Sequence, residues 1–154
     1  MDAKATLKEG LTFIATADSG FEMRLDTSRR VGGDESGFPP LELIAMSLAG
    51  CSAMDVLSIL RKKQQRVTAF ETRVHADQAP DYPKVFTRLQ LQFIVSGHSI
   101  DQAAMLRAIE LSITKYCTVY AMLSQAVPIE VGYKILEADG ANRDQLVVEG
   151  RYER

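Results

Sequence analysis

A long stretch without a polar face limits most strongly how this chain can fold. The residues from Leu41 to Leu60 favour a helix, Pro40 suits its first turn, and apolar or small side chains occupy nearly every side. Such a helix has to be covered all round, at the centre of a fold or in a dimer. Its small residues would let other backbones approach closely: Ala45, Ser47, Ala49, Gly50, Ser52 and Ala53.

A membrane span is the alternative for this helix, but its charges argue against one. Glu42 and Asp55 lie within the stretch and Arg61-Lys62-Lys63 follow it, so insertion into a bilayer is costly. The amino terminus lacks the basic and then apolar pattern of a secretion signal. The net charge of -2 gives no field that attracts nucleic acid. We therefore expect a cytoplasmic protein without a membrane or nucleic-acid partner.

Alternating segments on both sides of this helix predict strands. A second helix is predicted to begin after Ser99, with Gln102 completing a capping box, and to run to about Gln125. This order of strands, helix, strands, helix and strand favours the α+β class over a doubly wound parallel sheet. The predicted strands are Ala5 to Thr16, Phe21 to Leu25, Val67 to Ala76, Val85 to Val95 and Ile129 to Leu136.

The length of 154 residues predicts one domain, with residues 138–154 as a polar carboxy-terminal extension. We expect Leu146-Val147-Val148 to order part of this extension. The loop from Arg29 to Gly37 is rich in glycine and charge. It does not predict a phosphate site, because no Gly-Lys-Ser or Gly-Lys-Thr follows its glycines.

The two cysteines are the candidate reactive groups of the chain. Cys51 lies inside the first helix, and Cys117 lies on the apolar face of the second. A helix interior offers Cys51 no free amide, and Asp55 stands one turn on, so a cation that holds a thiolate there has to come from elsewhere. Judged by residue chemistry alone, two buried structural thiols are the more frequent alternative.

No metal site or other cofactor is expected from the spacing of the ligand residues. His75 and His98 are far apart, and neither a Cys-x-x-Cys nor a His-x-x-x-His pattern occurs. Tyr116 and Tyr120 flank Cys117 on the same helical face, where aromatic residues are more often part of a core than of a pocket.

Two cysteine motifs resemble those of the OsmC/Ohr family, especially its OsmC-like branch. The segment from Pro40 to Val56, PLELIAMSLAGCSAMDV, is similar to the first-cysteine helix of that family. Lys115-Tyr116-Cys117-Thr118-Val119 looks like its second-cysteine segment. The Gly32-Gly33 loop and the strand entry Pro83-Lys84-Val85-Phe86 also fit the branch, so the likeness extends to about Leu136.

The resemblance implies a thiol-dependent peroxidase that reduces organic hydroperoxides to alcohols. Cys51 would become a sulfenic acid, and Cys117 would resolve it as an intramolecular disulfide that a lipoyl-type dithiol then reduces. The family also implies an OsmC-like fold, in which antiparallel sheets pack around long central helices in an intertwined homodimer. Two functions stay open beside this one, namely a non-enzymatic dimer that binds small apolar ligands and a cysteine redox sensor.

The family places a glutamate and an arginine beside the reactive thiolate, and Glu42 and Arg24 are the candidates here. The family's glutamate stands one position earlier, where this chain has Leu41. Glu42 precedes Cys51 by nine residues, which on an ideal helix means about half a circle and roughly 13 Å. Glu42 would act through an irregular helix start or from the partner subunit, or it is simply an exposed first-turn acid. Arg24 is the cation nearest to the family's position in the first hairpin.

Overall fold

The computed structural model describes residues 1–140 and 144–153. Over these residues the chain has mixed α and β structure with two sheets, which confirms the predicted α+β class. The chain divides into two compact units, Met1–Ile44 and Ala45–Arg154.

The first unit contains an antiparallel sheet of consecutive strands, β1 (Ala3–Glu9), β2 (Thr12–Ala17) and β3 (Glu22–Leu25). A hairpin turn precedes β3, where the Gly20 N–H donates to the Ala17 carbonyl over 2.9 Å. The prediction of one strand from Ala5 to Thr16 was wrong, because the chain turns at Gly10, whose φ of 53° suits glycine. One glycine in an otherwise strand-forming run gave too weak a signal for this turn.

A buried carboxylate orders the glycine-rich loop that follows β3. Oδ2 of Asp26 accepts hydrogen bonds from the backbone N–H and the hydroxyl of Ser36, over 3.0 and 2.6 Å. Oδ1 accepts one from the Thr27 N–H over 2.7 Å. The two Ser36 bonds, followed by that of Thr27, hold the pKa of Asp26 far below its ordinary value. The loop therefore has a fixed centre, and its Arg29–Val31 segment forms a 3-10 turn.

Removing the negative charge of Asp26, by substitution or by protonation at low pH, should loosen the loop. Because folding lowers the pKa of Asp26 below its ordinary 3.8, its contribution to stability is present above that pH and declines as the pH falls below it. We expect faster tryptic cleavage after Arg29 and Arg30 in Asp26→Asn than in the wild type at neutral pH. Equal cleavage rates in the two proteins would contradict this role of the carboxylate.

The second unit contains a sheet in the order β4 (Arg66–Gln78), β5 (Phe86–His98), β6 (Ile129–Glu137) and β7 (Gln145–Arg151). Strands β4 and β5, both predicted by alternation, pair antiparallel. Strands β5 and β6 pair parallel, because the helices between them carry the chain back across the sheet. Strand β7 pairs with β6, so Leu146-Val147-Val148 orders part of the polar extension, as predicted.

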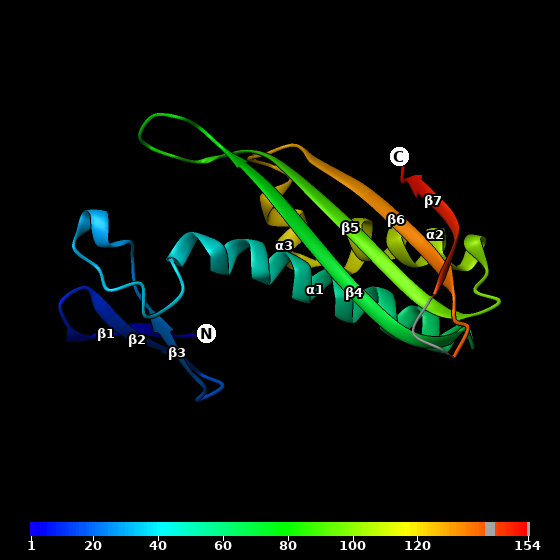
Figure 1. The fold of residues 1–154 in the computed structure, drawn as a ribbon, viewed down its shortest axis with the longest axis horizontal. Helices are drawn as coiled ribbons and strands as arrows, with labels where there is room; N and C mark the ends of the chain where they lie inside the picture. The colour runs from blue at the N-terminus through cyan, green and yellow to red at the C-terminus, as the bar shows by residue number, and fades with distance from the viewer. Residues whose placement is uncertain (141–143, 154) are drawn as a thin grey trace. The chain divides into compact units, whose positions relative to one another are not determined.

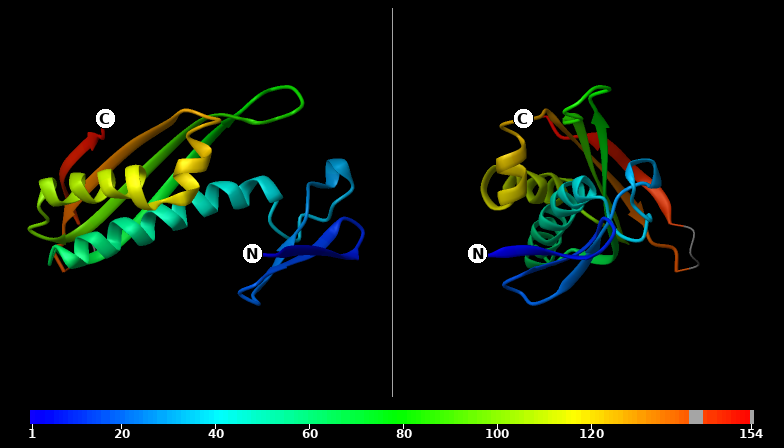
Figure 2. Two further views of the ribbon diagram at one scale, coloured as in Figure 1. Left: turned by 180° about the vertical axis from the view of Figure 1, so that it is seen from behind. Right: turned by 90° about the vertical axis from the view of Figure 1, so that its left-hand side faces the viewer.

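Helices α1 (Pro40–Lys62) and α2 (Gln102–Leu111) cover one face of this second sheet, as Figures 1 and 2 show. The core lies between the helices and the sheet. Phe93 at its centre is fully buried, as is Met105 of α2. The predicted alternation of β5 is confirmed, since its buried residues include Leu89, Leu91, Phe93 and Val95.

Helix α1 is buried along one stripe and exposed along the opposite one. The buried stripe contains Leu48, Ser52, Val56 and Leu60. The exposed stripe contains Met46, Gly50, Met54 and Ser58, and Met54 is 71% exposed. The expectation that the helix is covered all round is therefore not met within one chain. By length and composition α1 could also cross a membrane, with a mean hydropathy of 1.9; the core helices of soluble proteins share these properties.

The second predicted helix is interrupted, and its start was misplaced. Ser99 adopts a φ of 51°, while Asp101 caps α2 by accepting from the N–H groups of Ala103 and Ala104. After α2 comes a π-helical turn, η2 (Ser112–Tyr116), and then the separate helix α3 (Thr118–Leu123). A capping signature at Ser99 could not reveal that the carboxylate at Asp101 is better placed. The break between η2 and α3 falls at Cys117.

Candidate active site

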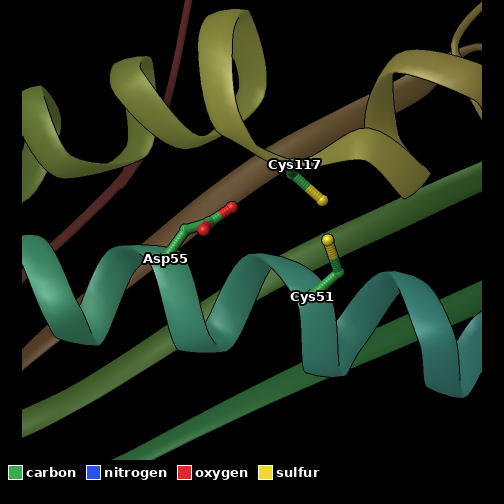
Figure 3. Close-up of side chains that lie close together, drawn as sticks. All are labelled: Cys51, Asp55 and Cys117. Atoms are coloured by element: carbon green, nitrogen blue, oxygen red, sulfur yellow. The ribbon is translucent and has the colours of Figure 1, made fainter.

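Cys51 and Asp55 stand one helical turn apart on α1 and therefore face the same side. Both side chains are partly buried. Figure 3 shows them directed towards Cys117, which the π-helical turn and α3 carry to the same place. The Cys51 Sγ, an Asp55 carboxylate oxygen and the Cys117 Sγ all lie within 4.8 Å of one another.

The helix break gives Cys117 its position. Its backbone is extended, with φ −72° and ψ 97°, and its N–H donates to the Ser112 carbonyl over 2.8 Å. Cys117 then acts as the N-cap of α3, where its sulfur accepts a hydrogen bond from the Tyr120 N–H over 3.3 Å. The side chain is 2% exposed. The Tyr120 N–H thereby fixes the Cys117 sulfur, and the side chain points towards α1 (Figure 3).

Both cysteines are free thiols, and they interact with each other. Burial raises the pKa of Cys117 to about 12, and its hydrogen bond to Cys51 acts in the same direction. The Tyr120 N–H opposes this rise, while the negative charges of Cys51 and Asp55 add to it. Cys117 is therefore a protonated donor at neutral pH, and Cys51 is the more accessible thiol of the pair.

A serine on the facing helical turn holds Asp55. The Ser112 hydroxyl, which is fully buried, donates to Oδ2 of Asp55 over 3.3 Å. The four-residue spacing from Cys51 to Asp55 is visible in the sequence, but it does not reveal that Asp55 joins the cysteine pair. Ser112 was missed, because nothing in the sequence places the π-helical turn opposite α1.

The charge of Asp55 should make Cys117 harder to ionise. In the Cys51→Ser background we expect Asp55→Asn to lower the pKa of Cys117, because it removes a negative charge that disfavours the thiolate. The rate of alkylation by iodoacetamide, measured against pH, reports this shift. Asp77→Asn, which removes a carboxylate from strand β4, is the matched control and should leave the profile unchanged. An identical profile for Asp55→Asn would contradict this assignment.

Arg24 and Glu42 lie in the first unit. Arg24, on β3, donates from Nε to the Ser36 hydroxyl over 3.0 Å, and one of its guanidinium nitrogens lies 3.9 Å from Glu9. Glu42 is exposed in the first turn of α1, which is helical from Pro40 onwards. Because α1 is regular from Pro40 onwards, no irregular turn brings Glu42 towards Cys51 of its own chain. A role for either residue at the site stays a prediction.

The cluster of Cys51, Asp55 and Cys117 also has the composition of a metal site, which cysteine and histidine spacing in the sequence did not indicate. The histidines lie elsewhere: Nε2 of His75 contacts Asp77 over 3.2 Å, and Nδ1 of His98 lies 3.6 Å from Glu137. A cavity of about 710 Å³ on the second sheet is lined by strand residues and does not include the cluster.

Comparisons with known proteins place these cysteines in a family. The model of a family described as OsmC-like protein matches residues 32–132, a range that contains both sulfurs. The chain is 38% identical to protein YhfA of Escherichia coli (strain K12) over 138 residues, which is 90% of this chain and 100% of YhfA.

Solved structures share the fold. The OsmC-like protein of Mycoplasma pneumoniae aligns with a TM-score of 0.73 at 17% identity, over 87% of this chain and 95% of that one. The organic hydroperoxide resistance protein OsmC of Legionella pneumophila aligns with a TM-score of 0.62 at 15% identity, over 86% and 94%. At these identities the similarity establishes the fold alone.

Proposed function

Because this chain belongs to the OsmC-like protein family, we infer that it is a thiol peroxidase that reduces organic hydroperoxides with Cys51 and Cys117. The observation that carries this inference is that two free sulfurs, one on α1 and one at the break between η2 and α3, lie within 4.8 Å of each other. A relative in fold from L. pneumophila is named for organic hydroperoxide resistance. That name supports the choice of peroxide over other oxidants.

The first chemical step belongs to Cys51. Its thiolate attacks the terminal oxygen of the hydroperoxide, the O–O bond breaks, and the alkoxide leaves and takes up a proton to become an alcohol. Cys51 is oxidised to a sulfenic acid in the same step. The partial exposure of Cys51 gives the peroxide access, whereas burial keeps Cys117 from reacting first.

The second step joins the two sulfurs. Cys117 attacks the sulfenic sulfur, a disulfide forms, and hydroxide leaves and is protonated to water. While Cys51 is reduced, its negative charge and the hydrogen bond that it accepts both raise the pKa of Cys117. Oxidation of Cys51 removes this charge and weakens this hydrogen bond. Cys117 is thus kept protonated until its partner has reacted, and its ionisation then becomes easier.

A dithiol of the lipoyl type returns the disulfide to two thiols by exchange. Over one cycle the hydroperoxide and the dithiol become an alcohol, water and an oxidised dithiol. We place this cycle in the reducing cytoplasm, where a transient disulfide between these cysteines would not persist without an oxidant.

A second copy of the chain completes the site in this proposal. The exposed stripe of α1, which contains Met46, Gly50 and Met54, packs against the partner in an intertwined homodimer. Glu42 then serves the partner's site, because it precedes Cys51 by nine positions and so faces away from Cys51 of its own chain. Arg24 is the proposed cation.

Steady-state turnover tests the enzymatic claim. Consumption of cumene hydroperoxide with dihydrolipoamide should be catalytic, and in this proposal it should exceed consumption of hydrogen peroxide, because the organic group contributes to binding. A single turnover without further consumption would make the protein a redox sensor instead. Saturable binding of an apolar ligand with no loss of thiols would make it a binding module.

A further inference from the structure

The reduced cluster presents a donor set that suits a soft divalent ion. It combines the two sulfurs of Cys51 and Cys117 with a carboxylate oxygen of Asp55, all within 4.8 Å of one another. Zinc binds thiolates at about 2.3 Å and carboxylates at about 2.0–2.2 Å, so a tetrahedral ion holds such ligands roughly 3.6–3.8 Å apart. The three atoms, none more than 4.8 Å from another, therefore need only small side-chain adjustments to reach the separations that one ion requires.

The carboxylate is already oriented for such a role. The buried hydroxyl of Ser112 donates to Oδ2 of Asp55, which leaves Oδ1 available as a ligand. Hydrogen bonds of this kind to a ligating carboxylate are typical of protein metal sites. Within residues 1–140 and 144–153, no ion pair of Asp55 with a lysine, arginine or histidine is found.

The charges of the cluster also favour a cation. Two thiolates and a carboxylate within 4.8 Å of one another are like charges at short range, so they repel one another as anions. A doubly charged ion would offset this repulsion and replace the thiol protons. Two thiolates and one carboxylate leave a fourth position for water, as in open zinc sites with three protein ligands.

We propose that the reduced protein binds one zinc ion per chain through Cys51, Asp55 and Cys117. Binding forms two Zn–S bonds and one Zn–O bond, and it releases the remaining thiol protons to solvent. No electrons are transferred. Zinc binding involves the same cysteines as the proposed peroxidase, but it does not depend on the peroxidase reaction. A disulfide excludes the ion, and the bound ion keeps the sulfurs from reacting with peroxide, so zinc and hydroperoxide compete for the same pair.

Cobalt is the probe, because thiolate ligands give Co²⁺ an intense near-ultraviolet absorption. The reduced full-length protein, titrated with CoCl₂ without oxygen or peroxide, should develop this band with one ion per chain, and ZnCl₂ should abolish it. Ser112→Ala should weaken binding about 10-fold, and Asp55→Asn by at least about 10-fold. Absence of the band, or unchanged affinity in Asp55→Asn, would overturn the proposal.

Surface histidines supply the matched control. The double variant His75→Gln/His98→Gln removes both histidines and should bind cobalt as the wild type does. Protein oxidised to the disulfide should show no thiolate band. Loss of cobalt binding in the histidine variant, or cobalt binding that persists after oxidation, would refute the site. Peroxide consumption is measured separately with a chelator present, so failure of the peroxidase and failure of the metal site give different results.

Discussion

Peroxide consumption is expected to fall to the uncatalysed rate when Cys51 is replaced by serine. A hydroxyl is a far weaker nucleophile than a thiolate, and the buried and protonated Cys117 cannot take over the first step. The measurement is consumption of cumene hydroperoxide at saturating dihydrolipoamide. Circular dichroism should show an unchanged fold, since serine is close to cysteine in size.

Cys117→Ser is the companion variant and should behave differently. It retains Cys51, so one equivalent of hydroperoxide is still reduced in the first turnover. No disulfide can follow, and the sulfenic acid accumulates or is oxidised further. A burst of one alcohol per chain, followed by a stall, is therefore expected. Full activity in Cys51→Ser would refute the assignment of the nucleophile.

Met54→Glu is expected to convert a dimer into monomers. Met54 is 71% exposed in the single chain and lies on the exposed stripe of α1 with Met46 and Gly50. In the proposed interface a glutamate there would be buried without a partner, which costs several kcal/mol, about enough to shift association by orders of magnitude. Sedimentation equilibrium measures the change.

Val147→Glu is the matched control for this surface. Val147 is also an exposed apolar residue, at 59%, but it lies on strand β7. This variant should remain a dimer. A dimer that survives Met54→Glu with wild-type affinity, or a wild type that is monomeric, would show that the stripe is not the contact surface.

Periodicity in the sequence predicted the elements that form the core. The alternation of Leu89, Leu91 and Phe93 placed β5, and the apolar stretch of α1 placed the helix that covers it. These signals succeed because burial imposes a repeat that is visible residue by residue. The approach of Cys51 to Cys117 was expected from family resemblance, since no local pattern links two residues so distant in sequence.

Several parts of the site had no local signal. The break at Cys117 interrupts a segment whose residues are all compatible with one helix, so periodicity extended the helix across it. The contact from Ser112 to Asp55 depends on how η2 meets α1, which is a matter of tertiary packing. The parallel pairing of β5 with β6 is likewise set by the path of the connecting helices.

Intact mass and thiol titration after one equivalent of cumene hydroperoxide show whether Cys51 and Cys117 react with peroxide as a pair. We expect each chain to lose both thiols, to become lighter by about 2 Da through loss of two hydrogen atoms, and to yield a crosslink between the Cys51 and Cys117 peptides. Two intact thiols in an unchanged mass, with the peroxide still present, would contradict this expectation.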